Sequence, residues 1–164
     1  METFVFASAL EKTLLQQMGS LVGNVSPVLQ PLLRSLQNFQ TEFIGYLTVA
    51  AEVNVNVEAY PQVDIAIFTG NDTVWQKQAV VLASTATTTN DLVALWAIYA
   101  ALDKSAQFYR QAVLNTPHPL SRLFWGSLAE IKTMMRRRVD GLLRVMYNGI
   151  WEQIGFAPFA LGRE

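Results

Sequence analysis

Four stretches of this chain repeat apolar residues at the spacing of an α-helix, and they constrain the fold more than any other feature. They cover residues 9–22, about 27–48, about 91–111 and about 121–147. In the second stretch, for example, Leu32, Leu36 and Phe39 recur three or four positions apart, which places them on one helical face. Helix-breaking residues separate neighbouring stretches. We therefore predict a mainly α protein, built as an up-down four-helix bundle.

A different pattern lies between the second and third stretches. Apolar and polar residues alternate at 53–57 and 63–67, and Val74-Trp75 follows a turn-forming sequence at 69–72. Alternation with a period of two is typical of β-strands. The sequence therefore predicts a small antiparallel β-ribbon at one end of the bundle. Residues 1–8 are also expected to be extended.

The length and composition favour one domain that associates with copies of itself. The 164 residues, 1–164, correspond to a single domain. Hydrophobic residues make up 51% of the chain and charged residues 15%, which excludes a disordered protein. A small domain cannot bury that much apolar surface alone, so self-association is expected. The most apolar run, residues 92–102, is too short to span a bilayer, and we expect no membrane partner.

The residue types needed for most catalytic chemistry are scarce. The chain has no Cys, which excludes a thiolate nucleophile and a Cys-ligated metal. Its single histidine, His118, stands between two prolines, where a catalytic base is rarely placed. Neither of the common glycine-rich phosphate-binding motifs is present. We therefore expect no enzyme activity, no catalytic residue, no cofactor, no metal and no small-molecule substrate.

The charges are distributed unevenly along the chain. Residues 1–103 carry a net charge of −6, whereas residues 104–164 carry +5. This asymmetry favours a basic end that faces a polyanion, although two compensating surfaces within one bundle would give the same count. Six basic side chains are the candidate phosphate contacts: Lys104, Arg110, Arg122, Arg136, Arg137 and Arg138. The alternative for the arginine run is a solvated helix face with an Arg136–Asp140 pair.

A four-helix chain also suggests the bundle that holds two metal ions between carboxylates. Such a site needs Glu on two helices and Glu-x-x-His on the other two. Residues 103–109 and 124–130 faintly resemble the rhythm of rubrerythrins, but Glu130 is followed by Ile-Lys-Thr, so a Glu-x-x-His motif is absent there. The alternative function is therefore a metal-free, ferritin-like scaffold protein that forms small closed oligomers. An enzyme of unrecognised type is a third alternative.

The order of short motifs resembles that of another family, the coat proteins of the rod-shaped tobamoviruses of plants. The motifs that carry this resemblance are Phe4-Val5-Phe6, Gly23-Asn24, Pro61-Gln62-Val63, Val74-Trp75 and Asp91-Leu92-Val93. Residues 115–149 also align with the last long helix of that family without a gap. The sequence departs from the family by about ten extra residues near 50–60, and residues 137–140 allow a second register.

The resemblance implies a structural capsid protein that assembles into a helical rod around single-stranded RNA. It implies a location in the virion, and in the host cytoplasm before assembly. In that family, carboxylates of neighbouring subunits are held close together, and their repulsion tunes assembly because like charges raise each other's proton affinity. The positions that correspond to such carboxylates, or lie beside them, are Glu42, Asp91, Asp103 and Glu130.

Overall fold

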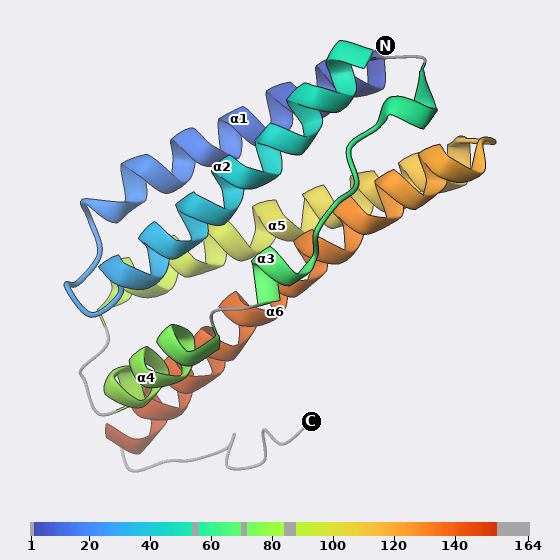
Figure 1. The fold of residues 1–164 in the computed structure, drawn as a ribbon. Coiled ribbons are helices and arrows are strands. Elements are labelled where there is room, and N and C mark those ends of the chain that lie inside the picture. The colour runs from blue at the N-terminus through green and yellow to red at the C-terminus, as the bar shows by residue number, and fades with distance from the viewer. Residues whose placement is uncertain (1, 54–55, 70–71, 84–87, 154–164) are drawn as a thin grey trace.

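Four long helices form the body of the protein (Figure 1). The computed structural model describes residues 2–53, 56–69, 72–83 and 88–153. The long helices are α1 (Glu2–Val22), α2 (Gln30–Val53), α5 (Thr89–Asn115) and α6 (Pro119–Gln153). The prediction of a mainly α protein is therefore confirmed. Within the described residues, no helix is both long enough and apolar enough to cross a membrane.

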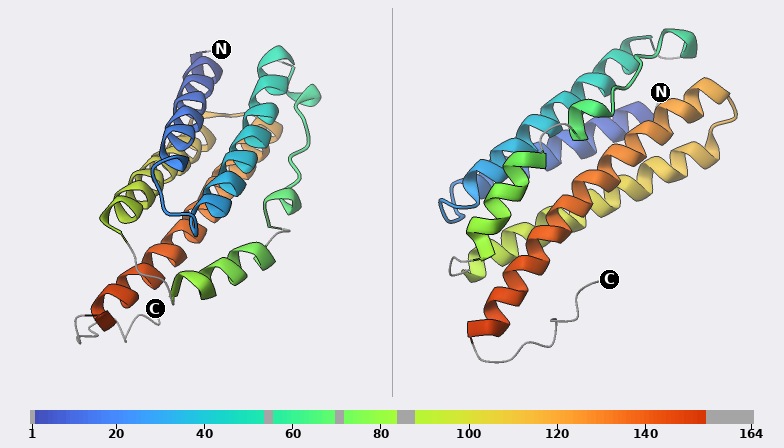
Figure 2. Two further views of the ribbon diagram at one scale, coloured as in Figure 1. Left: turned by 90° about the vertical axis from the view of Figure 1, so that its left-hand side faces the viewer. Right: turned by 60° about the horizontal axis from the view of Figure 1, so that its bottom comes forward.

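The helices are arranged as two hairpins joined by one long connection. Helix α1 pairs with α2, and α5 pairs with α6, each pair running antiparallel. The connection between α2 and α5 returns along the length of the bundle, so these two helices run in the same direction (Figures 1 and 2). The start of α2 consequently lies beside the start of α5, where Ser26 donates two hydrogen bonds to Asp91. This order differs from the predicted up-down sequence of four helices.

The predicted β-ribbon is wrong for the residues that the structure describes, which include no strand. The connection instead contains a 3-10 turn η1 (Val57–Ala59) and two short helices, α3 (Ala66–Thr69) and α4 (Asp72–Ala83). Phe68 of α3 is buried, and so are Trp75 and Leu82 of α4, which lie seven residues apart, a spacing that suits one helical face. Part of the first expected strand, residues 54–55, lies outside the described residues.

Residues 2–8 are helical rather than extended, and the packing of the core gives the reason. Phe4 and Ala7 are buried, and they continue the apolar face that Leu14 and Met18 form farther along α1. The Phe4 ring lies 4.9 Å from the Trp125 ring. Packing against α6 therefore extends the first helix by seven residues beyond the predicted start at residue 9.

Candidate functional site

Four polar side chains meet in the middle of the bundle, one from each long helix. They are Glu11 of α1, Gln40 of α2, Tyr109 of α5 and Lys132 of α6, and all four have 0% exposure. We call this set the core polar cluster. Each member occupies a position on the inward face of its helix, where an apolar residue is usual. Glu11, for example, lies on the same face of α1 as the buried residues Leu14 and Met18.

The side chains of the core polar cluster satisfy one another. Glu11 Oε2 accepts a hydrogen bond from Gln40 Nε2 at 2.6 Å and lies 2.5 Å from Lys132 Nζ. Glu11 Oε1 accepts a hydrogen bond from the Tyr109 hydroxyl at 3.1 Å. Lys132 also donates to Gln40 Oε1, and its ammonium lies 4.1 Å from the centre of the Phe43 ring. A buried charge is tolerated only when it is paired in this way.

Burial shifts the proton affinities of two members of the cluster. The pKa of Lys132 is lowered because burial penalises its ammonium, although the charge and the hydrogen bond of Glu11 oppose this effect. The pKa of Tyr109 is raised well above its ordinary value, first by burial and then by the negative charge of Glu11. Both shifts have the same physical origin, which is the cost of a charge away from water.

The donor set of the cluster does not suit a metal ion. Glu11 supplies its only carboxylate, and the ammonium of Lys132 already neutralises that charge. No group of three or more His, Cys, Asp or Glu side chains that could hold a metal occurs in the described part of the chain. Ser105, one helical turn before Tyr109 on α5, is also buried, and its hydroxyl has no hydrogen-bond partner in the structure.

The structure separates the six basic residues predicted to contact phosphate. Lys104, Arg110 and Arg137 are exposed, and the last two line one groove between α5 and α6. The Arg122 side chain donates to the carbonyl oxygen of Thr116 at 2.6 Å, at the far end of the bundle. Arg110 and Arg137 therefore share one groove, and the Arg122 side chain is held by the backbone of Thr116.

The other two predicted phosphate contacts are occupied within the chain. Arg136 forms an ion pair with Asp103. Arg138 lies on another side of α6, where its guanidinium stacks over the rings of Phe39, at 5.2 Å, and Trp75, at 5.6 Å. Both arginines are therefore partly buried and have partners within the chain.

The four predicted inter-subunit carboxylates also lie in different environments. Glu42 and Glu130 are exposed, on α2 and α6. Asp91 is 1% exposed and accepts hydrogen bonds from the backbone and the hydroxyl of Ser26, at 2.8 and 2.7 Å. Asp103 is bound to Arg136. Asp91 and Asp103 thus already have partners within one chain.

The core polar cluster was not predicted from the sequence, because its members follow neither a run of exposed charge nor a metal-binding spacing. One signal was available. Glu11, Gln40 and Lys132 fall at inward positions of the predicted helices, and a charged residue at such a position needs a partner. The sequence does not show that these partners lie on different helices.

Comparison with known proteins finds no matching family model, no similar curated protein and no matching solved structure.

Proposed function

We propose that this protein is a metal-independent, ferritin-like helical bundle that acts as a self-associating scaffold. The observation that carries the proposal is the Lys132–Glu11 ion pair in the core polar cluster. In a carboxylate-bridged metal bundle, the inward positions of all four helices hold ligands for two cations. In this chain, the positive charge among the inward residues is the ammonium of Lys132.

The connection between the hairpins supports the ferritin-like assignment. Four-helix bundles with one long crossover are typical of ferritin-like folds, whereas simple up-down bundles have short loops throughout. In this chain, the crossover between α2 and α5 runs along the bundle (Figure 2).

The spacing of the inward residues supports the same assignment. Ferritin-like metal sites take a Glu-x-x-His motif from each of two helices and one Glu from each of the other two. In this chain, buried residues with the i, i+3 spacing are Gln40 and Phe43 on α2, and Lys132 and Met135 on α6. Glu11 on α1 and Ser105 on α5 are buried positions at which the single Glu residues could stand. Among these six residues, only Glu11 has a carboxylate side chain.

The RNA coat protein remains a second candidate, because Arg110 and Arg137 line one exposed groove. It is the weaker one, since Asp91 and Asp103, which the resemblance assigned to assembly, and Arg136, a predicted phosphate contact, have partners inside the chain. The expected β-ribbon is also absent from the described residues. Glu42→Gln tests this candidate directly, because removing one carboxylate of a repelling pair should keep rods intact at higher pH.

A metal-binding measurement tests the proposed function. Isothermal titration calorimetry with Fe²⁺, Mn²⁺ and Zn²⁺ should show no site in the wild-type protein. A variant that carries Gln40→Glu, Phe43→His, Ser105→Glu, Lys132→Glu and Met135→His should gain a site, and a matched variant with new carboxylates at exposed Gln16 and Gln107 should not. Stoichiometric binding of two metal ions by the wild-type protein would overturn the proposal.

Light scattering and electron microscopy test the scaffold role against the coat role. The scaffold should form one small closed oligomer that is the same with and without single-stranded RNA, at about pH 5 and about pH 8. A strict monomer at all concentrations would contradict self-association. Rods that lengthen with RNA and come apart at high pH would favour the coat protein instead.

A further inference from the structure

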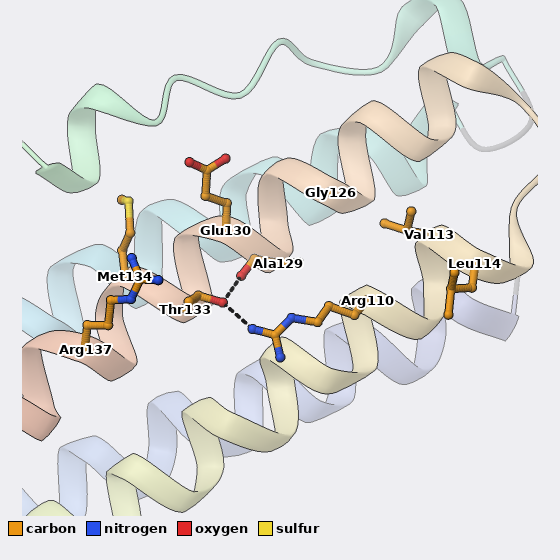
Figure 3. Close-up of a pocket in the computed structure, with 9 residues that line it drawn as sticks. All are labelled: Arg110, Val113, Leu114, Gly126, Ala129, Glu130, Thr133, Met134 and Arg137. Atoms are coloured by element: carbon orange, nitrogen blue, oxygen red, sulfur yellow. Dashed lines mark hydrogen bonds between the residues drawn. The ribbon is translucent and has the colours of Figure 1, made fainter. Parts of the chain in front are cut away.

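A groove on the outer side of α5 and α6 is distinct from the core polar cluster. We call it the α5–α6 groove. Its lining residues are Arg110, Val113, Leu114, Gly126, Ala129, Glu130, Thr133, Met134 and Arg137 (Figure 3). Its volume is about 590 Å³, which lies within the range of roughly 300–1,000 Å³ that is usual for small-molecule sites.

The α5–α6 groove is open because small residues line α6 where it faces α5. A Cβ atom added to Gly126 would meet nothing nearer than the Val113 side chain, at 3.9 Å. The groove also has apolar walls. Leu114 is 70% exposed at one side, and Met134 lies half-buried at the other. Covering an apolar surface of this kind with a hydrocarbon chain lowers the free energy.

Two arginines that have no acidic partner among the described residues add positive charge to the apolar groove. Arg110 donates one hydrogen bond to the Thr133 hydroxyl, at 2.8 Å, which leaves most of its five N–H donors for other partners. Arg137 forms no ion pair or hydrogen bond with any residue that the structure describes. The Arg110 guanidinium points toward Thr133 and the Arg137 guanidinium lies beside Met134, whereas the Glu130 carboxylate points away from both (Figure 3).

We propose that the α5–α6 groove binds a single-chain amphiphile with a carboxylate or phosphate head group. The head group lies between Arg110 and Arg137, since guanidinium groups match both oxyanions with paired hydrogen bonds. The alkyl chain covers Val113, Leu114 and Met134. This chemistry fits the groove better than RNA does, because a phosphate backbone gains nothing from the apolar walls. The inference does not depend on the core polar cluster.

Calorimetric titrations with defined probes test the head group and the chain separately. Decanoate and decyl phosphate, below their micelle concentrations, should each bind at one site per chain, and the tighter of the two identifies the preferred head group. Decyltrimethylammonium has the same chain with the opposite charge, and acetate and inorganic phosphate have the head group alone. Decyltrimethylammonium should bind at least about tenfold more weakly, because it cannot form a charged hydrogen bond with the arginines. Acetate and inorganic phosphate should also bind at least about tenfold more weakly, because they have no chain to cover the apolar walls.

Matched variants test whether binding takes place in the groove. Arg110→Gln and Arg137→Gln should each weaken decanoate binding about tenfold, whereas Arg34→Gln, an exposed arginine on α2, should leave it unchanged. Gly126→Leu fills the groove and should abolish binding. Gly141→Leu places the same side chain on an open part of α6 and should not. Circular dichroism of each variant confirms that the fold is retained.

Three results would overturn the proposal. Equal binding of decyltrimethylammonium would indicate an unspecific apolar surface. Unchanged decanoate binding in both arginine variants would place the site elsewhere. Binding of oligouridylate, lost in Arg110→Gln and Arg137→Gln, together with no binding of decanoate or decyl phosphate, would identify the groove as an RNA interface.

Discussion

At the scale of single residues, Lys132 is fully buried, so its charge is stabilised by its partners inside the bundle and not by water. We predict that Lys132→Met lowers the free energy of unfolding by about 3–5 kcal/mol, because it leaves the Glu11 carboxylate buried without a counter-charge. Arg144→Met removes a half-exposed ion pair with Asp140 and should cost less than about 1 kcal/mol. Urea denaturation measures both. Equal losses of unfolding free energy in the two variants would contradict the prediction that the buried ion pair matters more for stability than the half-exposed one.

The pKa of Tyr109 predicts how stability changes in alkaline solution. In the unfolded chain tyrosine ionises near pH 10.0, whereas burial beside Glu11 keeps Tyr109 protonated in the fold. Its contribution is therefore present below pH 10 and is lost as the pH rises toward its folded pKa, by up to about 1.4 kcal/mol per pH unit. The lowered pKa of Lys132 has the opposite effect, because it makes stability rise with pH. Lys132 is present in both the wild type and Tyr109→Phe, so its contribution largely cancels when the two are compared.

The advantage of the wild type over Tyr109→Phe should therefore shrink above pH 10. Denaturation of both proteins at several pH values between about 8 and 11.5 measures this difference. A difference that stays constant across the range would contradict the raised pKa of Tyr109.

At the scale of elements, Asp91 fastens the start of α5 to the start of α2. Asp91→Ala removes two hydrogen bonds from Ser26 to a charged acceptor and should cost about 3 kcal/mol. Thr88→Ala removes only the helix cap, in which the Thr88 hydroxyl accepts from the Asp91 N–H, and should cost about 1 kcal/mol. Thermal unfolding of the two variants measures both losses of stability. Higher stability of Asp91→Ala would instead fit a repelling inter-subunit carboxylate.

The elements differ in how well local sequence predicts them. The four long helices follow from apolar spacing and from the breaks near residues 23–24 and 115–119, because helix hydrogen bonds are local. The connection between α2 and α5 was predicted as strands because alternation at 53–57 and 63–67 imitates them. In the structure, Val63 and Ile65 are partly buried against the helical core, so their apolar side chains pack on helices instead of forming a sheet face.

At the scale of the whole molecule, the parallel arrangement of α2 and α5 can be measured directly. Because the chain has no native Cys, spin labels can be placed on pairs of introduced cysteines at exposed Asn24, Asn90 and Asn115. Pulsed electron resonance should find the 24–90 pair close together and the 24–115 pair farther apart by a large part of the α5 length, about 40 Å. The reverse order would indicate an up-down bundle.

The sequence by itself determined the mainly helical character, the four long helices and the excess of apolar surface, since each depends on composition or on neighbours a few residues apart. Only the tertiary structure decided which helices run parallel, that the described part of the crossover holds short helices and no strand, and that Glu11 and Lys132 form an ion pair. These features join residues far apart in the chain. The pairing of Glu11 with Lys132 spans 121 positions, and no local pattern encodes which buried charge will meet which.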